Sequence, residues 1–198
     1  MATGSRSPTL KLIAGLGNPG ATYRGTRHNV GFEVLDELAA RHGTSWNAAP
    51  ADALMARWRT DGDALLVKPL TFMNLSGEAI GALCRYYRID TADVLIVCDD
   101  VHLPIGRLRL RAGGSDGGHN GLKSVARHLG TTDYARLRIG VGRGDVRRDL
   151  AAHVLGGFDA DEAAGVQEAI TRSADAVTLW MTEGLAPAMN LFNRQDAT

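Results

Sequence analysis

Apolar side chains along the chain follow two different periods, which predict strands that alternate with helices. Strands are predicted where a short apolar run, or a strict apolar–polar alternation, stands between turn residues. These segments are 9–14, 53–58, 64–67, 94–98, 107–111 and 137–141. The turn sequence Thr60-Asp61-Gly62-Asp63 predicts that the second and third segments pair as a hairpin.

Apolar residues that recur every three or four positions predict helices. The first helix covers 30–41, and its apolar face consists of Val30, Val34, Leu35, Leu38 and Ala39. Asn29 is the expected N-cap of this helix, and Gly43 is its expected stop. Further stripes predict a helix around 80–87, a helix over 122–129 that ends at Gly130, and a long helix over 159–183.

Strands and helices that alternate around an inserted hairpin are typical of an α/β fold. The run VLIVC at 94–98 is apolar throughout, as expected for a strand that is covered on both faces. We therefore expect a single domain over residues 9–198, built as a three-layer α/β/α sandwich around a mixed, mostly parallel sheet. Residues 1–8 are expected to form a disordered N-terminal tail.

Composition narrows the class of protein. The chain has 198 residues, of which 44% are hydrophobic, so it can form a core and is not a disordered chain. It contains no run of about 20 apolar residues of the kind that spans a membrane, and its first ten residues lack the apolar region of a secretory signal. Two cysteines, Cys84 and Cys98, cannot form a disulfide framework, which favours the reducing cytoplasm.

Charge is balanced over the whole chain but is unevenly distributed. The 22 Lys and Arg residues equal the 22 Asp and Glu residues. Residues 105–148 nevertheless contain ten basic and three acidic residues, a balance of +7, whereas residues 149–198 contain two basic and eight acidic residues, a balance of −6. Strict alternation at 107–111 also places three arginines on one face of a strand. This pattern is compatible with a surface that faces a polyanion, although solvated charged faces are also common.

The glycine-rich loop at 15–20 matches the G-x-G-x-x-G pattern of dinucleotide-binding turns. In such turns a helix begins at once, so that its N-terminus meets the pyrophosphate. Here Pro19 interrupts the loop and the next helix begins only near Asn29, with no acidic residue at the expected strand end. A turn that needs glycine backbone freedom is therefore the better interpretation, although it leaves Asn18 unexplained.

Polar side chains capable of chemistry gather at predicted strand ends and helix starts. Asn18 and His28 lie in the loop after the first strand, and Asp99-Asp100 follow the apolar run at 94–98. Asn74 and His119-Asn120 open helices, where each asparagine could also be only an N-cap. Active groups collect at the carboxyl ends of strands in open α/β sheets, and an acid at a strand end can orient a histidine that acts as a general base.

Other catalytic classes lack their signatures. The six histidines show no metal-ligand spacing, and no serine stands in a G-x-S-x-G elbow. Cys98 ends an apolar strand, where a buried thiol is expected rather than a nucleophile. A water molecule activated by a histidine remains as the expected nucleophile.

Five blocks of sequence, in order, resemble the bacterial peptidyl-tRNA hydrolases. They are GLGNPG at 15–20 with Tyr23 and TRHNVG at 26–31, KPLTFMNLSG at 68–77, DD at 99–100 with LP at 103–104, GGSDGGHNGL at 113–122, and RLRIGVG at 136–142. The resemblance extends from about Leu10 to Phe192.

The resemblance implies an esterase that hydrolyses the ester between a peptidyl, or N-blocked aminoacyl, group and the 3′ ribose of tRNA. It implies a monomeric cytoplasmic enzyme that acts on the acceptor arm and 3′ end of peptidyl-tRNA, without a metal, a cofactor or an obligate protein partner. The residues that match the family's catalytic positions are His28 as the base, Asp99 rather than Asp100 as its partner, and Asn18 and Asn120. Matching substrate-binding positions are Tyr23, Phe72, Met73, Asn74 and His119. Positions that match or approximate contacts to tRNA phosphates are Arg109, Arg111, Lys123 and Arg138.

The sequence departs from the family pattern in two places. His102 stands where many relatives have a second acidic residue before Leu-Pro, and the segment 142–145 also differs. Two other classes stay open on the residues alone. A metal-dependent aminopeptidase would need a ligand cluster, and a non-catalytic RNA-binding module would leave His28, Asp99 and the asparagines without a role.

Overall fold

The computed structural model describes residues 9–60, 62–144 and 149–194, so the expected tail over residues 1–8 lies outside the described residues. Seven strands form one mixed sheet in the order β2-β3-β4-β1-β5-β7-β6. Their bounds are β1 Lys11–Gly15, β2 Asn47–Ala48, β3 Ala53–Trp58, β4 Ala64–Pro69, β5 Val94–Asp100, β6 Leu108–Arg111 and β7 Ala135–Gly140. Strands β4, β1, β5 and β7 run parallel, whereas β3, β2 and β6 are antiparallel to their neighbours.

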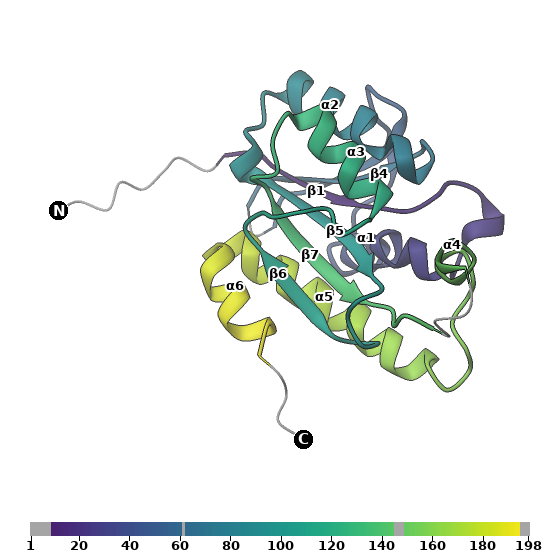
Figure 1. Cartoon of the computed structure of the whole chain (residues 1–198). Coiled ribbons are helices and arrows are strands. Elements are labelled where there is room, and N and C mark those ends of the chain that lie inside the picture. Colours follow the sequence, from purple (N-terminus) through teal and green to yellow (C-terminus); the bar gives the residue numbers. More distant parts are fainter. Residues whose placement is uncertain (1–8, 61, 145–148, 195–198) are drawn as a thin grey trace.

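Helices cover both faces of this sheet (Figure 1). The α-helices are α1 Val30–Arg41, α2 Ser76–Tyr87, α3 Asn120–Leu129, α4 Leu150–Val154, α5 Ala163–Glu183 and α6 Leu185–Phe192. Short 3₁₀ helices are η1 Ala21–Tyr23, η2 Arg27–Asn29, η3 Met73–Leu75 and η4 Thr91–Asp93. Helices α2 and α3 pack on one face, and α1, α5 and α6 pack on the other.

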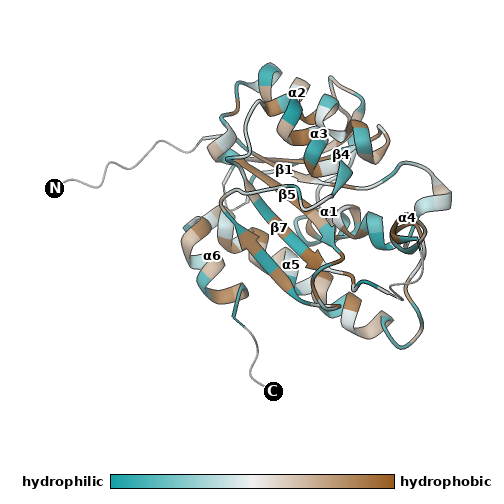
Figure 2. Ribbon diagram, viewed as in Figure 1, coloured by the Kyte–Doolittle hydropathy of each residue, from teal (hydrophilic) through white to brown (hydrophobic). Residues whose placement is uncertain are grey.

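Two apolar cores result from the alternation of side chains along the strands. In β1, Leu12 and Ala14 are buried with α2 and α3, whereas Ile13 is buried with α1 and α5. Figure 2 shows the same alternation in colour along β6, where Leu108 and Leu110 are buried and Arg109 and Arg111 are exposed. The predicted three-layer sandwich around a mixed sheet is confirmed, with the parallel strands at its centre and antiparallel strands at both edges.

The structure differs from the predicted elements mainly at their ends. Helix α1 has the predicted bounds, but β5 continues through Asp99 and Asp100, which therefore belong to the strand rather than to the loop after it. The extra residues pair with β7, a long-range ladder that local periodicity does not reveal. Strand β6 begins after Arg107, α5 begins at Ala163, and the short elements β2, α4 and α6 were not predicted.

Two glycines allow the first turn of α1 to lie directly on the strand ends. A Cβ on Gly31 would stand 2.5 Å from the carbonyl oxygen of Val97 and 2.6 Å from that of Leu16. A Cβ on Gly15 would stand 2.3 Å from the carbonyl oxygen of Gly31. This close approach explains Gly15 and Gly31 by packing, and it places the residues just before α1, including His28, at the end of β5.

We expect Gly31→Ala to lower the free energy of unfolding by about 1–3 kcal/mol, because backbone atoms on both sides cannot move aside for a methyl group. Urea unfolding measures this change. Gly165→Ala is the matched control, since Gly165 lies in α5 with no atom within 4 Å of its would-be Cβ, and alanine there should be neutral or slightly stabilising. Equal midpoints for the two variants would contradict the packing argument.

Candidate active site

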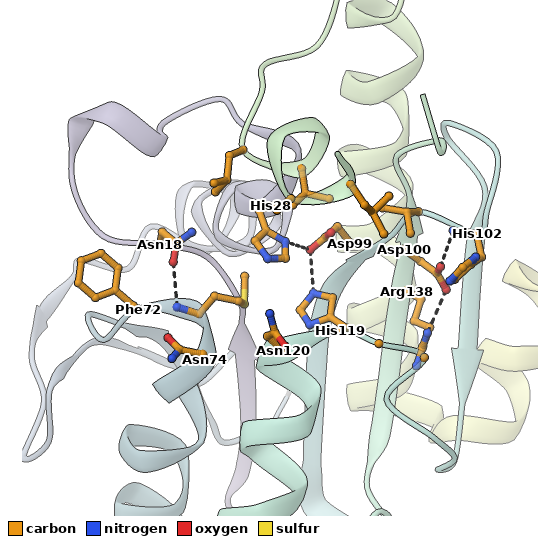
Figure 3. A pocket seen from close by; sticks show the side chains of 18 of the residues that line it. Asn18, His28, Phe72, Asn74, Asp99, Asp100, His102, His119, Asn120 and Arg138 are labelled. Carbon is orange, nitrogen blue, oxygen red and sulfur yellow. Dashed lines mark hydrogen bonds and ion pairs between the residues drawn. The ribbon is translucent and has the colours of Figure 1, made fainter. Parts of the chain in front are cut away.

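A cleft of about 580 Å³ opens at the carboxyl ends of the parallel strands. Asn18 follows β1, Phe72 to Asn74 follow β4, and Asp99 is the second-last residue of β5. All of the residues predicted for catalysis and substrate binding line this one cleft: Asn18, Tyr23, His28, Phe72, Met73, Asn74, Asp99, His119 and Asn120. The side chains converge from four separate parts of the chain (Figure 3).

At the centre of the cleft, one buried carboxylate holds two histidines. The same oxygen of Asp99, Oδ1, lies 2.8 Å from Nδ1 of His28 and 2.9 Å from Nε2 of His119 (Figure 3). Asp99 is 2% exposed. Its neighbour Asp100 points the other way, as successive residues of a strand do, and accepts from Arg138 at 3.1 Å and from the backbone N–H of His102 at 2.8 Å. The structure therefore places Asp99, and not Asp100, beside His28.

The hydrogen bonds assign a proton to one nitrogen of each ring. His28 donates its Nδ1–H to Asp99, which leaves Nε2 as the basic nitrogen of a ring that lines the cleft. Nδ1 of His119 accepts from the backbone N–H groups of Gly121 at 3.1 Å and Leu122 at 3.3 Å, so its proton must be on Nε2, where it is donated to Asp99. His119 therefore caps α3 through one ring nitrogen and holds the carboxylate of Asp99 through the other.

These contacts control the ionisation of Asp99. Burial by itself would raise the pKa of this carboxyl group, but the interactions with His119 and then His28 outweigh burial and hold the pKa well below its ordinary value. The carboxylate is consequently ionised at neutral pH, and it can stabilise a positive charge that forms on the ring of His28.

A chain of amide contacts orients Asn18. The side chain of Asn29 accepts from the backbone N–H of Asn18 at 2.8 Å and donates to its carbonyl oxygen at 2.9 Å. Asn29 occupies the predicted N-cap position of α1, but its side chain contacts Asn18 and makes no capping hydrogen bond. The oxygen Oδ1 of Asn18 accepts from the backbone N–H of Met73 at 2.8 Å (Figure 3), so the amino group is the end that serves the cleft.

The other two asparagines are exposed and are not helix caps. Asn74 lies inside η3, and the N-cap position of α2 belongs to Leu75. Asn120 is the first residue of α3, whose cap is His119. Both amides therefore face the cleft without a role in their own helices (Figure 3).

The loop that carries His119 follows an antiparallel strand, unlike the loops that carry Asn18 and Asn74. Strand β6 is antiparallel to β7, so residues 112–119 must run back along the sheet to reach the cleft. Arg136 donates to the carbonyl oxygens of Gly114 and Ser115, and Arg138 donates to those of Ser115 and Asp116. These two arginines hold the returning loop against β7.

The four predicted tRNA contacts therefore fall into two groups. The side chain of Arg138 is 13% exposed and is already engaged by Asp100 and the loop, so the expectation of a phosphate contact does not fit its position. Arg109 and Arg111 are exposed beside a second hollow, and Lys123 is exposed on α3. Arg107 precedes the strand and donates to the carbonyl oxygen of Asn193, which removes it from the predicted row of three arginines.

Sequence reasoning missed the apolar wall opposite Phe72. Phe72 is 56% exposed on one rim, and Leu150, Val154 and Leu155 of α4 and its C-terminal end line the cleft as well. The sequence does contain a short helix signal at this place, because Leu150 is followed four and five positions later by Val154 and Leu155. Asp149 is the N-cap, and its side chain accepts from the backbone N–H of Ala151.

Within the described residues, His28, Asp99 and His119 form a group whose donor atoms all lie within 4.8 Å of one another. Both ring N–H groups point at one oxygen of Asp99 at hydrogen-bonding distance, so a cation would have to displace both protons. The arrangement fits proton transfer better than metal binding. Among the helices of the described ranges, none is long and apolar enough to cross a membrane.

Comparison with known proteins identifies close relatives. The family model described as Peptidyl-tRNA hydrolase matches residues 12–198. The peptidyl-tRNA hydrolase of Desulforudis audaxviator is 48% identical over 93% of both chains, and that of Chloroflexus aurantiacus is 47% identical over 92% of this chain and 98% of its own. The crystal structure of peptidyl-tRNA hydrolase from Acinetobacter baumannii superposes with a TM-score of 0.88 at 36% identity, covering 96% of this chain and 97% of that one.

The depressed pKa of Asp99 makes stability depend on pH. Its ionised carboxylate stabilises the folded state fully above the unfolded pKa of about 3.9, and this contribution is lost as the pH falls toward the lower folded pKa. We therefore expect the wild type to exceed Asp99→Asn in unfolding free energy at pH 6, and the difference to shrink progressively below about pH 4. Urea unfolding from pH 6 to pH 2.5 checks this, with the exposed Asp161→Asn as control. A difference that stays constant over this range would contradict the assignment.

Proposed function

The chain belongs to the peptidyl-tRNA hydrolase family and hydrolyses peptidyl-tRNA, and we propose that it does so with a water molecule activated by His28. The observation that carries this mechanism is the 2.8 Å contact between Nδ1 of His28 and the buried carboxylate of Asp99. It leaves Nε2 as the proton acceptor at the cleft, which is the geometry that a general base requires.

In the proposed reaction, Nε2 of His28 takes a proton from water while the water oxygen attacks the ester carbonyl carbon. Asp99 stabilises the imidazolium ring that forms. The tetrahedral intermediate then collapses, the bond to the ribose oxygen breaks, and His28 returns the proton to that oxygen. The products are a free carboxylic acid on the peptide and a free hydroxyl group on the tRNA.

The oxyanion of the intermediate needs hydrogen-bond donors that are already in place. The amino group of Asn18 is held toward the cleft because its oxygen accepts from the backbone N–H of Met73, and Asn120 lines the same cleft. We assign the oxyanion contact to these two amides, each of which would supply roughly 3–4 kcal/mol. Asn74 is assigned to the peptide main chain, and Tyr23, Phe72 and Met73 to apolar contacts with the substrate.

His119 receives a different role from the one expected. It lines the cleft, but both ring nitrogens are engaged, one by the start of α3 and the other by Asp99. We assign it to the positioning of Asp99 rather than to substrate binding.

The acceptor arm of tRNA is assigned to the exposed cations beside the cleft. Arg109 lies opposite Arg138 in the sheet and Arg111 lies opposite Arg136, so all four project on the face that α3 covers. Arg109, Arg111 and Lys123 are the exposed members of this group, and they leave their charges available to phosphates.

We also propose that the enzyme acts as a monomer in the cytoplasm without a cofactor. Support comes from the cleft, whose catalytic groups all belong to one chain. The two cysteines are free and buried, as is usual in a reducing compartment, and burial raises the pKa of the Cys84 thiol to about 11.

We expect His28→Ala to lower the single-turnover rate of N-acetyl-aminoacyl-tRNA hydrolysis by at least ~10²-fold, because general-base assistance is lost. Binding of tRNA, measured separately by filter retention, should persist. Asp100→Asn serves as the control, since Asp100 faces Arg138 rather than His28. Near-normal turnover by His28→Ala would rule out His28 as the base, and loss of wild-type activity with a chelator would favour a metal mechanism instead.

Replacing both Arg109 and Arg111 by alanine should weaken tRNA binding and reduce the log–log salt slope by about 1 to 2, since each lost phosphate contact changes it by roughly 0.7–0.9. Hydrolysis of a minimal N-acyl-aminoacyl-adenosine should change little. Arg59→Ala, which removes an exposed cation near the other edge of the sheet, is the control. A salt slope equal to that of the wild type would show that these arginines do not contact phosphates.

A further inference from the structure

The residue immediately before His28 is a buried cation that the mechanism does not use. Arg27 is 6% exposed. Burying a guanidinium group costs free energy unless the group is paired and hydrogen-bonded. The partners of the Arg27 guanidinium therefore indicate which part of the structure it stabilises.

Among the described residues, the side chain of Arg27 contacts one segment of the chain. Its Nη2 donates to Oε2 of Glu162 at 2.7 Å, its Nη1 donates to the carbonyl oxygen of Gly157, and its guanidinium lies 5.0 Å from the ring of Phe158. Its backbone N–H donates to the carbonyl oxygen of Gly156 at 3.0 Å, and the preceding Thr26 forms a β-bridge with Gly157. Arg27 thus ties the loop of His28 to residues 156–162.

The segment that Arg27 holds continues the apolar wall of the cleft. Residues 156–162 follow α4, and Leu150, Val154 and Leu155 contribute that wall. A helix of five residues is too short to be stable alone, so its position depends on anchors on either side. On the other side, Nε2 of His153 contacts the carbonyl oxygen of Gly142 at 2.9 Å. Arg27 supplies the anchor on the side of His28.

The anchor point at Glu162 is itself well held. Its Oε2 also accepts from the backbone N–H of Asp159 at 2.8 Å, and Glu162 immediately precedes α5, which packs against α1. Oε2 of Glu162 therefore links the loop that carries His28 to the segment 156–162, directly before the start of α5.

We propose that Arg27 is a positioning residue that fastens the α4 wall of the cleft to the loop carrying His28. Substrate packed against this wall is then held at a constant distance from the base. The proposal rests on the function proposed above. It predicts that loosening the contact impairs substrate binding, because His28 keeps its own support from Asp99.

The test compares Arg27→Gln, Arg27→Lys, Glu162→Gln and the double variant Arg27→Gln/Glu162→Gln. Arg41→Gln is the matched control, since Arg41 pairs with Asp175 and also ties α1 to α5, but at the opposite end of α1 from His28. Steady-state hydrolysis of N-acetyl-leucyl-tRNA gives KM and kcat. Hydrogen exchange at the amides of Leu155 and Gly156 reports on the wall independently of catalysis.

We expect Arg27→Gln to raise KM by about tenfold, equivalent to about 1.4 kcal/mol, with kcat changed less than about threefold and with faster exchange at both amides. Arg27→Lys should recover part of this loss, because it retains the charge but not both donors. The double variant should resemble Arg27→Gln, since both changes remove the same contact. Arg41→Gln should alter neither KM nor the exchange of these amides.

A lowered unfolding temperature with unchanged KM and unchanged exchange would show that Arg27 is only structural and would overturn the proposal. A fall in kcat alone would also overturn it, by showing that Arg27 acts on the base. If Arg27→Gln does not fold, Glu162→Gln decides the outcome, because its amide oxygen can still accept from Asp159. The exchange result does not depend on the role of His28, so failure of this proposal and failure of the proposed mechanism are distinguishable.

Discussion

The arrangement of the site depends on one ionised carboxylate that is 2% exposed and held by two histidines. A buried charge is tolerated only when it is fully hydrogen-bonded, and here the two bonds have different purposes. The bond to His28 fixes the orientation of the ring that we propose as the base. The bond to His119 requires α3 to begin at that residue, because the other nitrogen of His119 accepts from the first turn of this helix. Catalytic alignment and the start of a helix are therefore parts of the same network.

Parallel strands bring the remaining groups to this carboxylate without long connections. Their carboxyl ends share one edge of the sheet, so the residues that follow β1 and β4 meet the end of β5. Close packing of α1 on Gly15 completes this arrangement, because the loop before α1 can then reach Asp99. The loop from antiparallel β6 is the exception, and it needs Arg136 and Arg138 to hold it along the sheet.

The basic residues of the segment 105–148 fall into two groups, buried and exposed, which a count of charges cannot distinguish. Arg136 is 1% exposed and donates from Nη1 and Nη2 to backbone carbonyl oxygens, and Arg138 is paired with Asp100. Their charges stabilise the molecule and are not available to a polyanion. Arg109, Arg111 and Lys123 stay exposed, so the surface charge toward tRNA is smaller than the balance of +7 over residues 105–148 indicates.

The sequence by itself determined the class of fold, because periodicity is a local property. The stripe over 30–41 predicted the bounds of α1, and the alternation over 107–111 predicted the two faces of β6, although the strand begins at Leu108. The ordered motifs also indicated the family, and with it His28, Asp99 and the asparagines. On the residues alone, Asp99 and Asp100 were equivalent neighbours. The tertiary structure separated them by geometry, in agreement with the resemblance, and it showed that the side chain of Asn29 contacts Asn18, that His119 caps α3, that α4 lines the cleft and that Arg27 contacts Glu162. The contact between Asn18 and Asn29 joins residues 11 positions apart, and the contact between Arg27 and Glu162 joins residues 135 positions apart. The other contacts have separations between these two or depend on a contact that has such a separation. A pattern of neighbouring residues does not reveal which distant partner a polar side chain contacts.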